Sequence, residues 1–306
     1  MKDHAAETIL VTGSGGQLGR YLLDACRDQG FRVVGLGANP GPGVDIQVDI
    51  ADVRAVETAI TDVHPTIVIH AAAYTDVDGC ERDPNKADRV NHHGAANIAR
   101  AAKELRAWLI AVGTDFVFSG SQEEPYSERA TPDPVSVYGS SKLAGERAVL
   151  DADPAFAVAR TAWVYGGAGK HFPRTVLTIV GDRGSMTVVD DEVSCPTFAG
   201  DLAEALVAAV DKRPAGILHL TNEGFINRYG LARAVVEAAG GDPEVIQPTT
   251  TEEFLSRYPL PAKRPVNSSL ANNRARELGI RLPAWRDAID RYVPALAREI
   301  GWQGQS

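Results

Sequence analysis

A tyrosine and a lysine four residues apart, Tyr138 and Lys142, have the most specific chemistry in this chain. On a helix, residues at this spacing share one face. A phenol has an ordinary pKa of about 10, and a neighbouring ammonium group favours the phenolate and lowers that pKa. The pair therefore predicts proton exchange with a carbonyl or an alcohol, with Lys142 tuning Tyr138 and holding the ribose of a nicotinamide.

A third candidate catalytic residue, Thr114, ends the apolar segment from Trp108 to Thr114. Open α/β sheets bind ligands at the carboxyl edge, where such a strand ends. We therefore expect the Thr114 hydroxyl to bond the reacting carbonyl oxygen. A simple strand-end cap is the alternative role for this threonine.

A glycine turn joins the apolar segment Thr8–Thr12 to a helical pattern. In a strand–turn–helix unit this spacing brings the backbone close to a pyrophosphate, which the positive end of the helix attracts. The turn predicts a dinucleotide site formed by Gly13, Gly16, Gln17, Leu18 and Gly19.

The end of the second expected strand indicates which dinucleotide is used. Proteins that prefer NAD usually carry a carboxylate there, but residues 35–39 read Gly-Leu-Gly-Ala-Asn. A 2′-phosphate is tolerated in such a site, with Arg20 as its candidate partner. We expect NADPH or NADH, NADPH being slightly favoured, and Asp49 and Ile50 are candidates for contact with the adenine.

Strand-like and helix-like segments alternate through the first half of the chain, which predicts a Rossmann-type, doubly wound parallel α/β sheet. We expect residues 1–162 to form the NAD(P)-binding domain. Residues 163–306 are expected to form a smaller α/β substrate lobe, part of which returns to the first domain. The expected strands are Thr8–Thr12, Phe31–Leu36, Thr66–Ala71, Trp108–Thr114 and Phe156–Thr161, and the expected helices Gly16–Gln29, Asn85–Leu105, Val137–Leu150, Leu202–Val210 and Tyr229–Ala239.

Composition excludes several classes of function. With a formal charge of -9, the 306-residue chain is unsuited to nucleic acid or to an anionic membrane surface. Residues 1–7 are polar and lack the apolar stretch of a signal peptide, and no run is long enough to span a membrane. Three scattered cysteines indicate reduced thiols, so we expect a cytoplasmic protein.

Taken together, these residues resemble the extended short-chain dehydrogenase/reductases, and more closely the dTDP-4-dehydrorhamnose reductases. The likeness runs over nearly the whole chain. Besides the glycine turn, it rests on ordered blocks at residues 71–78, 114–118, 137–146, 160–166, 190–197 and 263–268.

The resemblance implies Thr114, Tyr138 and Lys142 as the catalytic set. It also implies a dTDP-linked 4-keto-6-deoxysugar substrate, reduced at C4 with NAD(P)H, and a monomer or weak homodimer. Further cofactor contacts are implied for Ala71, Ala72, Ala73, Tyr138 and Lys142, and substrate contacts for Val77, Asp115, Trp163 and Arg264. Of these, Arg264 is expected to grip the diphosphate with two donors.

Departures from the family pattern leave the exact sugar open. Gly113 stands where a serine usually precedes the threonine, and Glu192 and Ser194 replace glutamine and glycine. Some relatives bridge a dimer through magnesium with an acidic residue on the first helix, but that position is Tyr21 here. We therefore predict no metal and no such dimer.

Two other functions remain open: a 4-ketoreductase for another nucleotide-linked deoxysugar, and a non-catalytic regulatory subunit of the same fold. A 4,6-dehydratase is disfavoured because Phe116 occupies the position of its catalytic glutamate. His92 and His93 are adjacent in an expected helix, where neighbouring side chains point to different faces, so we do not expect them to share a metal.

Overall fold

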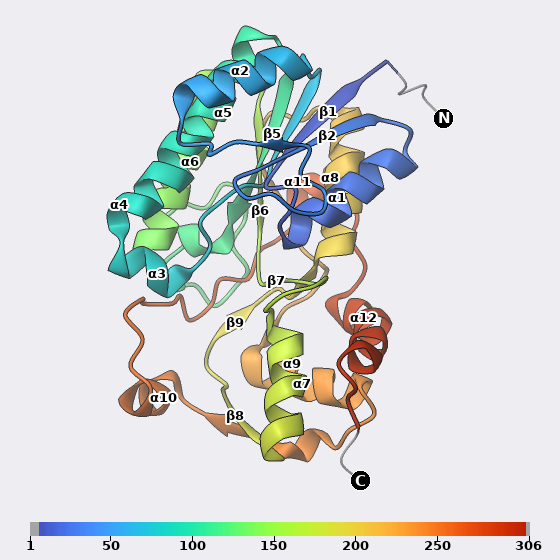
Figure 1. Ribbon diagram of the computed structural model, residues 1–306. Coiled ribbons are helices and arrows are strands. Elements are labelled where there is room, and N and C mark those ends of the chain that lie inside the picture. Colours follow the sequence, from blue (N-terminus) through green and yellow to red (C-terminus); the bar gives the residue numbers. More distant parts are fainter. Residues whose placement is uncertain (1–5, 304–306) are drawn as a thin grey trace.

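The computed structural model describes residues 6–303, and a seven-stranded parallel sheet forms its centre (Figure 1). The predicted doubly wound fold is therefore confirmed. The strands lie in the order β11-β6-β5-β4-β1-β2-β3. Their bounds are β1 Thr8–Thr12, β2 Arg32–Gly37, β3 Ile46–Gln47, β4 Ile67–His70, β5 Trp108–Thr114, β6 Ala157–Thr161 and β11 Gly216–His219.

The direction in which strands are added reverses beside β1. From β1 the chain adds β2 and β3 on one side, and it then crosses to add β4, β5, β6 and β11 on the other. Leu10 of β1 lies in register with Val34 of β2 and Val68 of β4. A reversal of this kind opens a crevice at the carboxyl ends of the strands, which is where ligands bind in such sheets.

Helices cover both faces of the sheet (Figure 1). One apolar layer is centred on Ile60 and Ile98, and the other on Leu22 and Leu206, all fully buried. Burial of these two layers is the main term that holds the helices on the sheet. The first face carries α2 (Val53–Val63), α5 (Ala95–Glu104) and α6 (Val137–Ala152), and the second α1 (Gln17–Asp28), α8 (Ala199–Lys212) and α11 (Asn273–Glu277).

The segment expected to be one helix from Asn85 to Leu105 is divided into three parts. After α3 (Val77–Arg82), α4 (Pro84–Ala87) is followed by a π-helical turn, η1 (Asp88–Gly94), before α5 begins. The amide of Asn91 in this turn bonds both backbone groups of Tyr74 and the hydroxyl of Ser141. Apolar periodicity could not reveal this turn, because it is fixed by contacts with distant residues.

A smaller group of helices and short strand pairs lies beyond the carboxyl edge of the sheet (Figure 1). Val180, Val235 and Val293, each at most 1% exposed, lie in its separate apolar core. Its helices are α7 (Phe172–Arg183), α9 (Arg228–Ala238), α10 (Thr251–Arg257) and α12 (Trp285–Glu299). Its strand pairs are β7 (Val164–Tyr165) with β10 (Thr197–Phe198), β8 (Met186–Val189) with β13 (Ile246–Thr249), and β9 (Val193–Ser194) with β12 (Ile226–Asn227). Short 3-10 turns are η2 (Asp115–Val117) and η3 (Pro243–Val245).

The two halves of the chain are interleaved. β11 pairs with β6 in the main sheet, and α8 packs against α1, although both come from the second half. The division at residues 162 and 163 stays a prediction. Within residues 6–303, no helix combines the length and the apolar character needed to cross a membrane.

Candidate active site

One cavity of about 1160 Å³ opens at the carboxyl edge of the sheet and contains every residue that the sequence singled out for binding or catalysis. The glycine turn, Asp49, Ile50 and Ala71–Ala73 line one part of it. The same cavity is lined by Val77, Thr114, Asp115, Tyr138, Lys142, Trp163 and Arg264. Residues from both halves of the chain thus share one continuous space.

The glycine turn has a geometry that side chains would prevent. Gly13 has φ +68°, a left-handed conformation, and a Cβ there would lie 2.8 Å from the backbone of Ala72. A Cβ on Gly19 would lie 2.2 Å from the carbonyl oxygen of Gly13. Helix α1 begins at Gln17 without a side-chain cap. The first backbone N–H groups of α1 therefore have no side-chain acceptor and can bind an anion. The turn fits a dinucleotide pyrophosphate.

Asp49 and Ile50, the predicted adenine contacts, line the cavity with Asn39 and with the arginines Arg20 and Arg89. Nη1 of Arg89 donates to Asp49 Oδ2 at 2.9 Å, so Asp49 is held by an ion pair on the surface. The pKa of Asp49 is lowered, mainly by a hydrogen bond from the backbone of Ala51. Arg20 also lines this cavity, and residues 38–44, directly after β2, carry no carboxylate, a composition that tolerates a 2′-phosphate.

Tyr138 lies on the first turn of α6, with only 9% of its surface exposed. The hydroxyl of Ser136 caps the helix by accepting from the backbone N–H of Gly139, which fixes the turn that carries the phenol. Burial raises the pKa of Tyr138 well above its usual value, and hydrogen bonding to Thr114 opposes that rise in part. The phenol is therefore protonated at neutral pH, the form needed to donate a proton.

Lys142 is held in place by the backbone of β5. Its Nζ donates to the backbone carbonyl of Val112 at 2.8 Å. Burial of the phenol is the largest influence on the pKa of Tyr138, and the predicted tuning of Tyr138 by Lys142 stays a prediction. Burial also lowers the pKa of Lys142 itself to about 8, with the charge of Glu146 opposing the shift.

Thr114 and Asp115 end β5 inside a buried hydroxyl network. The Thr114 hydroxyl donates to Asp115 Oδ1 at 3.2 Å and accepts weakly from the backbone of Phe116, so it is both a cap and a cavity-lining group. Ser194 donates to Asp115 Oδ2 at 2.9 Å, and Ser268 makes a short bond to the same oxygen. Burial raises the pKa of Asp115, and these hydrogen bonds oppose the rise.

The departures from the family pattern have structural reasons. Ser194 supplies one of the donors to Asp115, and Glu192 accepts from Arg228 Nε at 2.8 Å. A Cβ on Gly113 would lie 3.0 Å from both Arg160 and Val158, so a serine there would crowd β6.

Trp163 follows β6 with φ +40°, a backbone conformation that is strained for a bulky side chain and is found most often at functional sites. The guanidinium carbon of Arg228 lies 4.0 Å from the centroid of the indole ring. Both residues line the cavity. Arg228 was missed in the sequence because nothing in its local pattern distinguishes it from Arg233, the other arginine of α9.

Arg264 reaches the cavity from a loop after α10. Its Nη2 donates to Asp78 Oδ2 at 2.7 Å, and its Nη1 donates to the carbonyl of Ala262. The guanidinium is therefore fixed beside α3, whose first residue, Val77, also lines the cavity. An anionic ligand at this point would have to compete with Asp78 for one of its donors.

The fold, with a cavity lined by the glycine turn, Thr114, Tyr138 and Lys142, is that of a dinucleotide-dependent oxidoreductase of the short-chain dehydrogenase/reductase type. The family model for the RmlD substrate binding domain matches residues 7–298. The chain belongs to this family of dTDP-4-dehydrorhamnose reductases.

Similar proteins cover nearly the same length. A dTDP-4-dehydrorhamnose reductase of Mycolicibacterium smegmatis is 40% identical over 96% of this chain and 87% of its own. A probable dTDP-4,6-dihydroxy-2-methyloxan-3-one 4-ketoreductase of Streptomyces antibioticus is 37% identical over 93% of this chain and 94% of its own. The crystal structure of dTDP-4-dehydrorhamnose reductase from Bacillus anthracis, in complex with NADP, has a TM-score of 0.86 and 30% identity, covering 94% of this chain and 98% of that one.

Proposed function

We propose that the protein reduces the C4 ketone of dTDP-4-dehydro-6-deoxy-L-mannose to the alcohol of dTDP-L-rhamnose with NADPH or NADH. The observation that carries this proposal is the shared cavity, in which Thr114, Tyr138 and Lys142 lie together with the glycine turn and with Trp163. The names of similar proteins support the same reaction.

The cofactor supplies a hydride when it is bound, and the glycine turn with the N-terminus of α1 would hold its pyrophosphate. Tyr138 supplies the proton, because burial keeps its phenol protonated until negative charge develops on the ketone oxygen. Lys142 would hold the nicotinamide ribose. A positive charge on Lys142 also favours the phenolate that remains after the proton has left.

Thr114 would polarise the ketone by donating its single hydroxyl proton, which bonds Asp115 in this structure. The proton can turn toward a substrate because Asp115 keeps the hydrogen bonds from Ser194 and Ser268. Without a substrate, Asp115 orients the Thr114 hydroxyl by accepting this proton, and Asp115 also lines the proposed sugar pocket.

The substrate end of the cavity suits an anionic nucleotide sugar. Val77, Asp115, Trp163 and Arg264 are the proposed contacts from the sequence, and Arg228 is added by the structure. Arginines meet phosphate oxygens with two parallel donors, which compensates locally for the acidic character of the chain. We place the protein in the cytoplasm because its three cysteines are buried and unpaired, and we propose a monomer or weak homodimer.

The test is an assay of turnover with the ketosugar, which is generated in the reaction mixture. Two quantities are measured: the loss of reduced nicotinamide and the identity of the product sugar. We expect oxidation of NADPH or NADH, and a product with the C4 configuration of rhamnose.

A different C4 configuration would favour the second candidate, a 4-ketoreductase for another deoxysugar, as in the relative from Streptomyces antibioticus. Cofactor binding without turnover of any ketosugar would support the regulatory subunit instead.

A further inference from the structure

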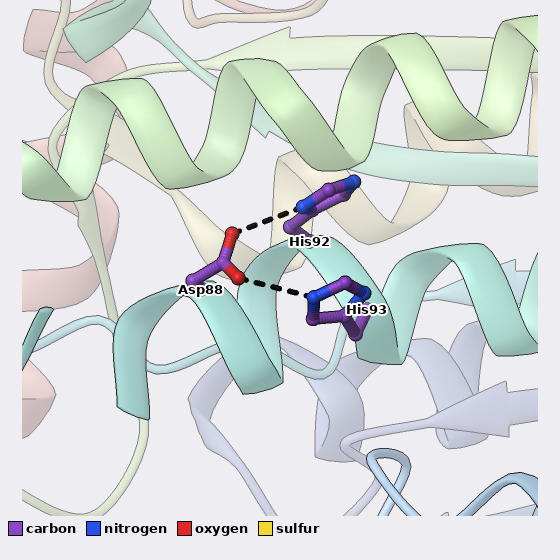
Figure 2. Close-up of side chains that lie close together, drawn as sticks. All are labelled: Asp88, His92 and His93. Carbon is purple, nitrogen blue, oxygen red and sulfur yellow. Dashed lines mark hydrogen bonds and ion pairs between the residues drawn. The ribbon is translucent and has the colours of Figure 1, made fainter. Parts of the chain in front are cut away.

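Three side chains that can bind metals converge on the surface of the π-helical turn η1 (Figure 2). His92 Nδ1 lies 2.9 Å from Asp88 Oδ1, and His93 Nε2 lies 3.1 Å from Asp88 Oδ2. One ligand atom from each residue lies within 4.8 Å of those of the other two. The two imidazole rings are stacked, with centroids 4.5 Å apart and planes inclined by 22°.

The π turn explains why adjacent histidines face the same partner. In an α-helix, neighbouring side chains diverge by about 100°, and the residues three and four positions on share a face with the first, whereas the residue five positions on does not. A π-helix makes i to i+5 hydrogen bonds, so each turn contains more residues than a turn of α-helix. His92 (i+4) and His93 (i+5) therefore both lie one turn after Asp88, and both contact its carboxylate. The expectation that His92 and His93 point to different faces is therefore wrong, because it assumed an α-helix.

The chemistry of these three groups is that of a transition-metal site. Neutral imidazoles and a carboxylate are ligands of zinc and of similar divalent ions, whereas magnesium requires oxygen ligands. His92 Nδ1 is hydrogen-bonded to one carboxylate oxygen of Asp88, and His93 Nε2 lies beside the other oxygen, so a cation can take the place of a proton between these atoms. All three side chains are between 33% and 61% exposed, so water can complete the coordination.

We propose that Asp88, His92 and His93 form a binding site for a divalent transition-metal ion of the Zn²⁺ class. It is separate from the catalytic set, but the same turn carries Arg89 and Val90, which line the cofactor side of the cavity. This proposal departs from the prediction of no metal, which rested on Tyr21 at the acidic position of some relatives, and from the separate expectation that His92 and His93 would not share an ion.

The experiment is titration of the full chain, without an affinity tag, with Zn²⁺ by calorimetry, and separately with Mg²⁺. We expect one zinc ion to bind per chain and magnesium to fail. Asp88→Asn, His92→Gln and His93→Gln should each lower the zinc affinity by about tenfold or more. His64→Asn is the matched control, since His64 is an exposed histidine outside the cluster and its left-handed backbone accepts asparagine.

A second measurement distinguishes a lost ligand from a damaged fold. Zinc should raise the melting temperature of the wild type and of His64→Asn but not of the three cluster variants, because binding to the folded state alone stabilises it. The proposal is overturned if the wild type binds no zinc, if magnesium binds as well as zinc, or if folded cluster variants retain wild-type zinc affinity.

Discussion

The guanidinium group of Arg228 lies against the indole of Trp163, 4.0 Å from its ring centroid, while its Nε is held by Glu192. The stack fixes an arginine in the part of the cavity where we propose that the substrate binds. We expect Arg228→Lys to raise the KM for the nucleotide sugar by about tenfold, because a lysine keeps the charge but loses the planar stack and the paired donors. The KM for the cofactor should stay unchanged.

Arg233→Lys, on the same helix and paired with Glu244, is the matched control for this prediction and should leave both KM values unchanged. Equal losses in Arg228→Lys and Arg233→Lys would mean that the helix, and not the stack, governs substrate binding.

Replacing the phenol should abolish proton donation without weakening cofactor binding. We expect Tyr138→Phe to lower kcat by about 10²–10⁴-fold, the range for loss of a general acid. The Kd for NADPH, measured by fluorescence titration, should be the same as in the wild type. Tyr229→Phe, in the substrate lobe, is the control. Full activity in Tyr138→Phe would remove the tyrosine from the reaction.

The activity should fall as the pH rises through about 8, where Lys142 loses its proton. Only the ammonium form favours the phenolate left on Tyr138, so the neutral amine supports turnover less well. In Lys142→Arg the charge persists, and the decline should move to higher pH. A profile that is the same in both proteins would assign the decline to another group.

Stability should respond to the same titration in the opposite direction. Since the folded pKa of Lys142 lies below its ordinary value of 10.5, the unfolded chain holds this proton more tightly between about pH 8 and 10.5. The contribution of Lys142 to the free energy of unfolding therefore rises with pH across that window. Comparing the urea unfolding of the wild type and of Lys142→Arg across this pH window would isolate the contribution of Lys142.

The choice between NADPH and NADH should depend on Arg20. We expect Arg20→Ala to raise the KM for NADPH by about tenfold and to leave that for NADH unchanged, because only NADPH carries the 2′-phosphate. Steady-state kinetics with each cofactor test this. An equal rise for both would place Arg20 at the pyrophosphate.

Breaking a buried ion pair should strongly destabilise the main sheet. Glu146 accepts two hydrogen bonds from Arg160, and the two side chains are only 5% and 3% exposed. Removing one partner of such a pair leaves a buried charge, which costs about 3–5 kcal/mol. We expect this loss for Glu146→Gln in chemical denaturation, while the surface change Glu57→Gln should cost less than about 1 kcal/mol.

The parts of the fold that depend on local pattern could be predicted from the sequence. Strand β1 has the expected bounds, Thr8–Thr12, and α6 begins at Val137 as expected, because apolar runs, glycines and caps mark these elements directly. Many of the predicted site residues line one cavity because they lie near strand or helix ends that face the same edge of the sheet, whereas Arg264 reaches it from a loop.

The remainder depends on tertiary contacts that leave no local mark. The π turn at Asp88–Gly94 arises where Asn91 bonds Tyr74 and Ser141. The apolar periodicity of the sequence gives no indication of these contacts. The position of Arg228 against Trp163 depends on how two distant segments meet. The pKa of Tyr138 depends on burial, which the spacing of Tyr138 and Lys142 does not report.

The pairing of β11 with β6 also determines how this chain can be divided. All five residues of β6 are buried, and residues 216–219 supply the hydrogen-bonding partner along one of its sides. A fragment ending at residue 162 would present β6 as a bare, apolar edge, which is a template for adding strands from other molecules. A shortened cofactor-binding protein made in this way should aggregate, and a circular permutant that retains the 216–219 strand should remain monodisperse.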